Sequence, residues 1–170
     1  MDLIVERKGN GWTASWSGEA FRCAVGRGGL VSALAKREGD GATPLGAWSL
    51  ERLFWRPDRG SLPATGLPSQ PIAPNDGWCD APLDPDYNRL IQSPFAPSHE
   101  TLWRADELYD LLVVLNHNRA PAVPFAGSAI FLHCAKPGYP PTAGCVALAR
   151  QDLERVLADA RLGDRVVVRG

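Results

Sequence analysis

The chain has 170 residues and a mass of 18.4 kDa, which suits a single domain that can bury a sizeable core. Its 18 Lys and Arg residues stand against 19 Asp and Glu residues, so no basic excess is present to neutralise phosphates, and this argues against a nucleic-acid binder. No stretch approaches the roughly 18 apolar residues of a membrane span, so we expect no transmembrane segment. We expect one domain over residues 1–170, and the sequence leaves its oligomeric state open.

The first part of the chain predicts a meander of strands. Residues 2–8, 12–16 and 20–25 are short runs of strand-forming residues, separated by turn signals at Gly9-Asn10-Gly11 and Ser17-Gly18. The chain also carries 17 glycines and 15 prolines, which is high for a helical bundle. Together these features favour turns, short strands and long ordered loops.

The middle of the chain has one strand pattern and one long irregular stretch. A compact glycine-rich loop is expected at residues 39–46, and residues 47–54 then predict a strand. Residues 56–98 are polar and proline-rich, and the stretch is too long for an ordinary connector. Its aromatic side chains, Trp78 and Tyr87 among them, indicate that it packs against the domain, so we interpret it as a functional segment or a lid.

The last third of the chain predicts the most deeply buried elements. Residues 111–116 and 128–134 are continuous apolar runs typical of central strands, and residues 145–148 form a shorter strand candidate. Residues 151–161 carry apolar side chains at helical spacing, and residues 164–168 predict a final strand. The fold class expected is mostly β, with one or two short helices.

Two residues near these strands are suited to nucleophilic chemistry. Side chains alternate faces along a strand, so His133 shares a face with Phe131 while Cys134 points the other way. A proline- and glycine-rich loop then leads to Cys145, and folding back of that loop would bring Cys145 Sγ to His133. Cys145 is therefore the candidate nucleophile, and Cys134 is the candidate structural cysteine.

The chemistry needs a base beside the thiol, because a thiol with a pKa of about 8.5 is mostly protonated at neutral pH. An adjacent imidazole can take that proton and produce a reactive thiolate. Gly144 allows a sharp backbone turn, and the N–H groups of Ala143, Gly144 and Cys145 could form a nest of donors for an oxyanion. The alternative interpretation is a buried thiol beside a core histidine that has only a structural role.

The segment 128–148 resembles the active-site signature of the L,D-transpeptidase catalytic domain, the YkuD-like family. The matching positions are His133 on its strand and, after a loop, Thr142-Ala143-Gly144-Cys145-Val146. The earlier Thr43-Pro44-Leu45-Gly46 resembles the family's glycine-rich stretch. This resemblance implies a β-sandwich with long loops, and it implies acyl transfer on peptidoglycan stem peptides without a metal or an organic cofactor.

Under this resemblance the Cys145 thiolate attacks the carbonyl between diaminopimelate and the terminal D-Ala. D-Ala leaves, a thioester forms, and an amine of a second stem peptide resolves it, while His133 acts as base and then as acid. We expect Thr142 to contact the substrate. Residues 56–98 are expected to shape the donor pocket through three side chains, namely Trp78, Tyr87 and Arg89.

The sequence departs from the family pattern in three ways. Ala143 and Ala147 occupy positions where the family commonly has basic residues, and the loop from His133 to Cys145 is short. The two alanines remove cations that would hold a substrate carboxylate. Three other residues are candidates to replace that charge: Arg89, Arg104 and Lys136.

Other functions and sites remain open from the sequence. The same residues could serve an L,D-carboxypeptidase with water as acceptor, or the domain could be a noncatalytic module that binds cell-wall peptides. A zinc site is disfavoured, because no standard ligand spacing is present and adjacent His133 and Cys134 face opposite ways. His99 and His117 are expected to be solvated loop or strand-end residues. Because His117 follows the end of a strand, it could also line the same pocket as His133 and Cys145.

Compartment and cysteine pairing are linked. The N-terminus lacks the features of a signal peptide. We therefore expect a cytoplasmic protein if the chain is complete, and a periplasmic or cell-envelope protein if a leader is missing. A disulfide between Cys23 and Cys79 is left open, although nothing in the sequence marks an oxidising compartment.

Overall fold

The computed structural model describes residues 1–170, which form thirteen strands and one helix. The elements follow one another along the chain as β1 (Asp2–Lys8), β2 (Gly11–Trp16), β3 (Glu19–Ala24), β4 (Leu30–Ser32), β5 (Thr43–Trp55), β6 (Ser69–Pro71), β7 (Asp76–Cys79), β8 (Leu90–Gln92), β9 (His99–Thr101), β10 (Leu111–Leu115), β11 (Phe131–Cys134), β12 (Val146–Leu148), α1 (Arg150–Asp159) and β13 (Arg165–Val168). The β-rich fold class with a short helix is confirmed.

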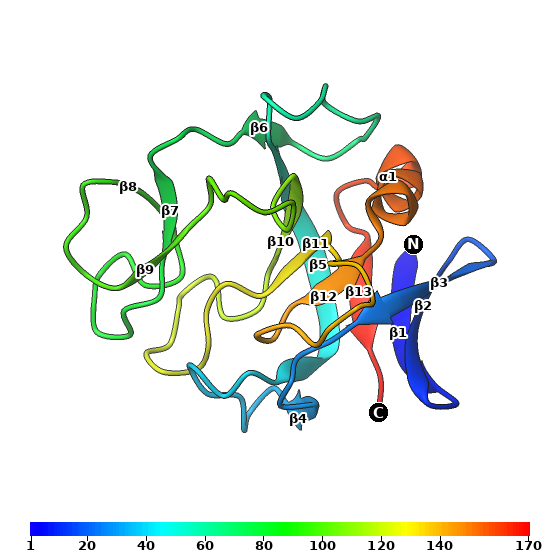
Figure 1. The fold of residues 1–170 in the computed structure, drawn as a ribbon. Coiled ribbons are helices and arrows are strands. Elements are labelled where there is room, and N and C mark those ends of the chain that lie inside the picture. The colour runs from blue at the N-terminus through cyan, green and yellow to red at the C-terminus, as the bar shows by residue number, and fades with distance from the viewer.

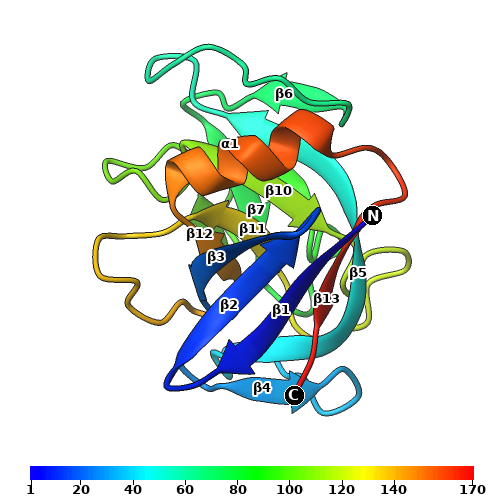
Figure 2. The same cartoon turned by 90° about the vertical axis from the view of Figure 1, so that its right-hand side faces the viewer.

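Ten strands form one large sheet in the order β10-β11-β12-β3-β2-β1-β13-β5-β4, with β6 attached to β5. The sheet curls on itself, because the long strand β5 pairs with β13 at its start and with β10 at its end. Opposite walls of the curled sheet therefore face each other across a shared apolar core, and α1 lies across one end (Figure 2).

Alternation of side chains explains this core. In β2, Ala14 and Trp16 are buried and Trp12 packs against the same cluster, as the strand period predicts. In α1, Leu153, Val156 and Leu157 form the buried face. The helix has ten residues, and no helix of the structure has the length and apolar character needed to span a bilayer.

Most predicted strands appear within a residue or two of their expected ends. The loop expected at residues 39–46 is shorter, because its second half belongs to a strand. β5 begins at Thr43, so Thr43–Gly46 lies in the sheet, paired with β4 and, at Gly46, with β13. A proline fits there because it lies near the start of the strand.

The long segment 56–98 is folded and supplies two strands of a small second sheet. β7 is the centre of this three-stranded sheet and pairs with β8 and β9. The small sheet lies on the opposite side of the molecule from the β1–β3 hairpins (Figure 1). All four cysteines are free in the structure, including Cys23 and Cys79.

Candidate active site

The candidate site is built on two neighbouring parallel strands, β11 and β12. Their register places Leu132 opposite Val146 and His133 opposite Ala147. Alternation sends Leu132, Cys134 and Val146 into the large core, while His133 and Cys145 line a cavity on the other face. The predicted separation of Cys134 from the reactive face is confirmed, and it also keeps His133 and Cys134 from acting as joint metal ligands.

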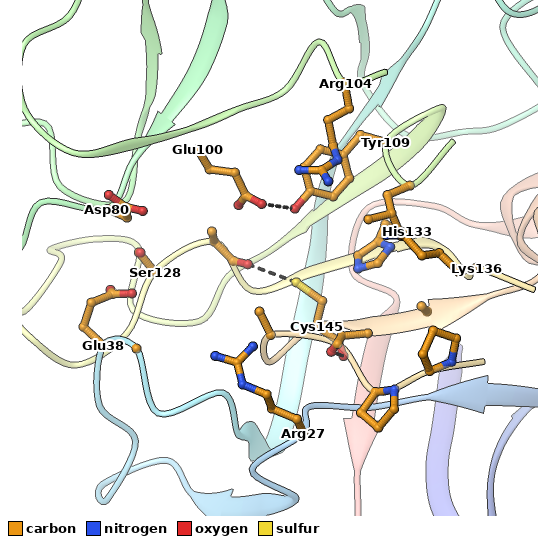
Figure 3. Close-up of a pocket in the computed structure, with 18 of the residues that line it drawn as sticks. Arg27, Glu38, Asp80, Glu100, Arg104, Tyr109, Ser128, His133, Lys136 and Cys145 are labelled. Atoms are coloured by element: carbon orange, nitrogen blue, oxygen red, sulfur yellow. Dashed lines mark hydrogen bonds between the residues drawn. The ribbon is translucent and has the colours of Figure 1, made fainter. Parts of the chain in front are cut away.

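The cavity has a volume of about 610 Å³ and lies between the loop before β5, the small sheet and the loop before β12 (Figure 3). His133 and Cys145 form part of its wall although their residues are only 4% and 6% exposed. Thr142, Ala143 and Ala147 also line it. The site is a hollow with a buried thiol at its base, in which a bound carbonyl group would be shielded from water.

The Cys145 thiol contacts backbone groups in the structure. Its Sγ donates to the carbonyl oxygen of Ala129 at 3.1 Å, and the N–H of Phe131 points at Sγ from 3.4 Å. No hydrogen bond joins it to His133, although both side chains line the same cavity. Burial raises the pKa of the Cys145 thiol to about 12, and the negative charge of Glu100 adds to this effect. The resting group is therefore a neutral thiol.

His133 is held in a defined tautomer. Its Nδ1 lies 2.8 Å from the carbonyl oxygen of Cys134, and a carbonyl oxygen can only accept, so Nδ1 carries the proton and Nε2 has a free lone pair. Burial lowers the pKa of His133 to about 4, so the ring is neutral at pH 7. The neutral imidazole is the form that can accept a proton from a thiol.

The neutral thiol predicts a steep pH dependence of its reactivity. Below the thiol pKa the thiolate fraction rises about tenfold for each pH unit. The alkylation rate of Cys145 by iodoacetamide in the free protein should therefore climb by about that factor per unit from pH 7 to pH 9, as followed by peptide mass analysis. A plateau near pH 7 would show instead that the resting protein already holds a thiolate.

The two sequence segments that carry the family resemblance meet at Gly144. Thr43 Oγ1 donates to the carbonyl oxygen of Gly144 at 2.8 Å and accepts from the N–H of Gly26 at 2.8 Å. Gly144 has a φ of +138°, and a Cβ built there would lie 3.0 Å from the carbonyl oxygen of Ala42. The close approach and the backbone conformation both require glycine. Thr43 therefore fixes the loop that presents Cys145.

Removal of the Thr43 hydroxyl should loosen that loop. In Thr43→Val the shape is kept, but the buried Gly26 N–H and Gly144 carbonyl lose their partner. We expect the free energy of unfolding to fall by about 1–3 kcal/mol, measured by chemical denaturation, together with slower acylation of Cys145. Thr43→Ser keeps the hydroxyl and should recover most of both. Equal losses in the two variants would mean that packing by the methyl group matters rather than the hydrogen bonds.

The expected nest of three N–H donors is only partly available. The N–H of Gly144 donates to Thr142 Oγ1 at 3.1 Å, and the Thr142 hydroxyl in turn donates to the Cys145 carbonyl oxygen at 2.7 Å. The N–H groups of Ala143 and Cys145 donate to no protein group. Thr142 thus has a structural role in the turn, and two donors rather than three are left for a ligand oxygen.

Four other expectations about the cavity need correction. Trp78 is 1% exposed, packs edge-on against Phe131 and does not line the cavity. Arg89 is exposed and does not line the cavity. Tyr87 is buried and does not line the cavity itself, but its hydroxyl donates to Glu38, which does. His117 is buried as well, with its Nε2 at 3.1 Å from the Ala126 carbonyl oxygen, so it is neither solvated nor part of the cavity.

The charged wall of the cavity comes mainly from residues that the sequence patterns do not mark. Of the three cations considered as replacements for the missing basic residues, Arg104 and Lys136 line the cavity. Seven charged residues in total contribute to the wall, and they are Arg27, Lys36, Glu38, Asp80, Glu100, Arg104 and Lys136. Of the segment 56–98, only Asp80 reaches this cavity.

A comparison with family models decides the relationship that this geometry indicates. The model of the L,D-transpeptidase catalytic domain, YkuD, matches residues 6–168. The chain belongs to this family. Searches of curated proteins and of solved structures found no match.

Membership of the L,D-transpeptidase family gives meaning to the two alanines in the cavity wall. Ala143 and Ala147 lie on either side of Cys145 along the chain, and both line the cavity. In this L,D-transpeptidase domain the nearby positive charge comes instead from Arg27 and Arg104, which belong to other segments, and from Lys136 in the loop between His133 and Cys145. The cavity therefore keeps cations in its wall but supplies them from other positions of the chain.

Proposed function

We propose that this L,D-transpeptidase domain acts on peptidoglycan stem peptides with Cys145 as its nucleophile and His133 as its acid and base. The observation that carries the proposal is the pair of neutral groups in one cavity: a thiol beside free backbone donors, and an imidazole with a free Nε2 lone pair. A cysteine and a neutral histidine on one wall are the groups that thioester chemistry requires.

Acylation begins with transfer of the thiol proton to His133 Nε2, after the thiol leaves the carbonyl oxygen of Ala129. The thiolate then attacks the carbonyl carbon between diaminopimelate and D-Ala, and the oxyanion accepts from the N–H groups of Ala143 and Cys145. His133 returns the proton to the nitrogen of the departing D-Ala as the C–N bond breaks. D-Ala therefore leaves as a neutral amine. The product is a thioester between Cys145 and the shortened peptide.

Resolution repeats these steps with a new nucleophile. An amine of a second stem peptide gives a proton to His133 and attacks the thioester carbonyl. The intermediate then expels the Cys145 thiolate, which recovers its proton from His133. The products are a cross-linked peptide and the free enzyme. If water attacks in place of the amine, the same residues act as an L,D-carboxypeptidase.

Product analysis separates these functions. Stem tetrapeptides are incubated with the protein, and the products are separated by mass. Transpeptidation predicts cross-linked dimers that have lost one D-Ala, whereas carboxypeptidase activity predicts only tripeptides. Tetrapeptide that binds and returns unchanged would overturn the proposal and favour a noncatalytic binding module. Fractionation of the native protein tests whether it meets these peptides at the cell envelope or in the cytoplasm.

A further inference from the structure

The end of the cavity opposite His133 and Lys136 carries a group of carboxylates. Glu38 comes from the loop before β5, Asp80 follows β7, and Glu100 lies in β9. Figure 3 shows these three side chains around Ser128, with Cys145 between them and His133. We call Glu38, Asp80, Glu100 and Ser128 the acidic arm.

The acidic arm is held by neutral donors rather than by cations. The Tyr87 hydroxyl donates to Glu38 Oε2, and the Tyr109 hydroxyl donates to Glu100 Oε1. Each tyrosine thus fixes one carboxylate oxygen and leaves the other without a hydrogen bond. Burial raises the pKa of both phenols, so they remain neutral hydroxyl groups. Glu38 and Glu100 are therefore held in place by hydroxyl groups and not by an ion pair with a cation.

Two buried polar atoms of the acidic arm make no regular hydrogen bond, although Ser128 lies close enough to the Tyr87 hydroxyl to affect its pKa. Asp80 Oδ1 and Ser128 Oγ are both buried, and neither makes a hydrogen bond. The Ser128 residue is only 7% exposed and is part of the cavity wall. Folded proteins rarely leave such atoms unsatisfied. A hydrogen-bonding group of a ligand in the cavity would satisfy them.

The positive charges of the cavity wall form no ion pair with the arm. Lys36 pairs with Asp40. Arg104 and Lys136 both form ion pairs with Asp106, which is not part of the arm. The distance is 2.7 Å from Arg104 Nε to Asp106 Oδ1 and 3.4 Å from Lys136 Nζ to Asp106 Oδ2. None of the three arm carboxylates forms an ion pair.

The carboxylates of the arm also act on one another, as the pKa of Glu100 indicates. Burial is the largest effect and raises the pKa of this carboxyl, the Tyr109 hydrogen bond and the charge of Arg104 lower it, and the charges of Asp80 and Glu38 raise it by smaller amounts. A cation bound among the three carboxylates would relieve this repulsion. The unfilled hydrogen-bond positions and the charge therefore favour the same ligand group, a small cation that donates hydrogen bonds.

We propose that the acidic arm binds a primary ammonium group of the donor peptide, one that takes no part in the reaction. The proposal rests on the proposed function, in which the donor residue is diaminopimelate. That residue has a second amine at the far end of its side chain, and Ser128 is adjacent in sequence to Ala129, whose carbonyl oxygen holds Cys145 Sγ at 3.1 Å. A donor acylating Cys145 can therefore extend this ammonium into the arm.

Chemistry distinguishes this ammonium from the amine of the acceptor. An acceptor amine must give up a proton before it can attack the thioester. Carboxylates around an ammonium stabilise its charged form and hold the proton on it. An amine bound in the arm is thus kept from acting as a nucleophile, whereas an acceptor that approaches from the side of His133 meets its base.

The test compares two donors that differ only in this amine. One is a stem tetrapeptide with the free side-chain amine of diaminopimelate, and the other is the same peptide with that amine acetylated. Acylation rates are measured by rapid quenching and intact-mass analysis. In Asp80→Asn and Glu38→Gln we expect the rate with the free-amine peptide to fall about tenfold, and the rate with the acetylated peptide to stay within about twofold.

The ratio of the two rates removes any change in the intrinsic reactivity of Cys145. Glu107→Gln is the matched control, because it removes an exposed carboxylate outside this cavity and should leave the ratio unchanged. An unaltered ratio in the arm variants would overturn the proposal, and so would an effect confined to the transfer step, which would place the acceptor amine in the arm. Failure of the unaltered protein to be acylated by either peptide would overturn the proposed function as well.

Discussion

Replacement of Cys145 by alanine should abolish covalent labelling of the protein by a carbapenem. A carbapenem is a strained acyl donor, and the proposed thiolate should open its ring to form a thioester that intact-mass analysis detects as one adduct. The other cysteines are far less suited, because Cys23, Cys79 and Cys134 are buried outside the cavity. We expect complete loss of the adduct, since no second nucleophilic thiol lines the site.

Cys134→Ala is the matched control. This residue lies eleven positions before Cys145, on the adjacent strand β11, but its side chain is in the large core. The variant should keep the adduct, even if removal of the sulfur lowers the stability of the core. An adduct that persists in Cys145→Ala, or one that disappears in Cys134→Ala without unfolding, would contradict the assignment of the nucleophile.

His133→Gln should lose most of its turnover while it stays folded. A general base typically contributes about 10²–10⁴-fold to rate, and glutamine cannot take the thiol proton although its amide can still donate to the Cys134 carbonyl oxygen. We therefore expect a loss of that size in the acylation rate, measured with a stem tetrapeptide, and a melting temperature within about 5 °C of the unaltered protein.

His117→Gln separates chemistry from folding in this experiment. His117 is also buried and lies outside the cavity. Its ring packs edge-on against Trp48, with 4.7 Å between the ring centroids. Its replacement should lower the melting temperature and leave the acylation rate per folded molecule unchanged. If His133→Gln unfolds while His117→Gln does not, His133 is a structural core residue and its catalytic role is wrong.

Much of the fold follows from periodicity in the sequence. Strand alternation places His133 and Cys134 on opposite faces, and the structure has that arrangement. The apolar runs that become β10 and β11 are buried along their whole length, as continuous hydrophobic strands should be. Both features depend on the local pattern of apolar residues along the chain, and that pattern can be read from the sequence.

The features that the sequence did not predict depend on the assembly of distant segments. Trp78 lies in a polar, proline-rich stretch, yet all four residues of β7 are buried: β8 and β9 pair with its edges, and Phe131 packs against Trp78. Strands of three or four residues show too little alternation for their burial to be predicted.

The acidic arm and the state of the thiol were hidden for the same reason. Glu38, Asp80 and Glu100 come from three separate segments, and no spacing relates them. The contact of Cys145 with the Ala129 carbonyl oxygen depends on the side-chain rotamer and on the path of the preceding loop. The sequence indicated a cysteine and a histidine on one face. It did not indicate which group the thiol of Cys145 donates to.

The most direct test of the proposed function is the mass of the acyl-enzyme formed with its own substrate. The protein is mixed with a stem tetrapeptide, quenched with acid within milliseconds to seconds, and digested for tandem mass analysis. The mechanism predicts that the peptide containing Cys145 gains the mass of the tripeptide acyl group, with D-Ala released in equal amount. An adduct that retains D-Ala, an adduct on another residue, or release of D-Ala by Cys145→Ala at an undiminished rate would contradict it.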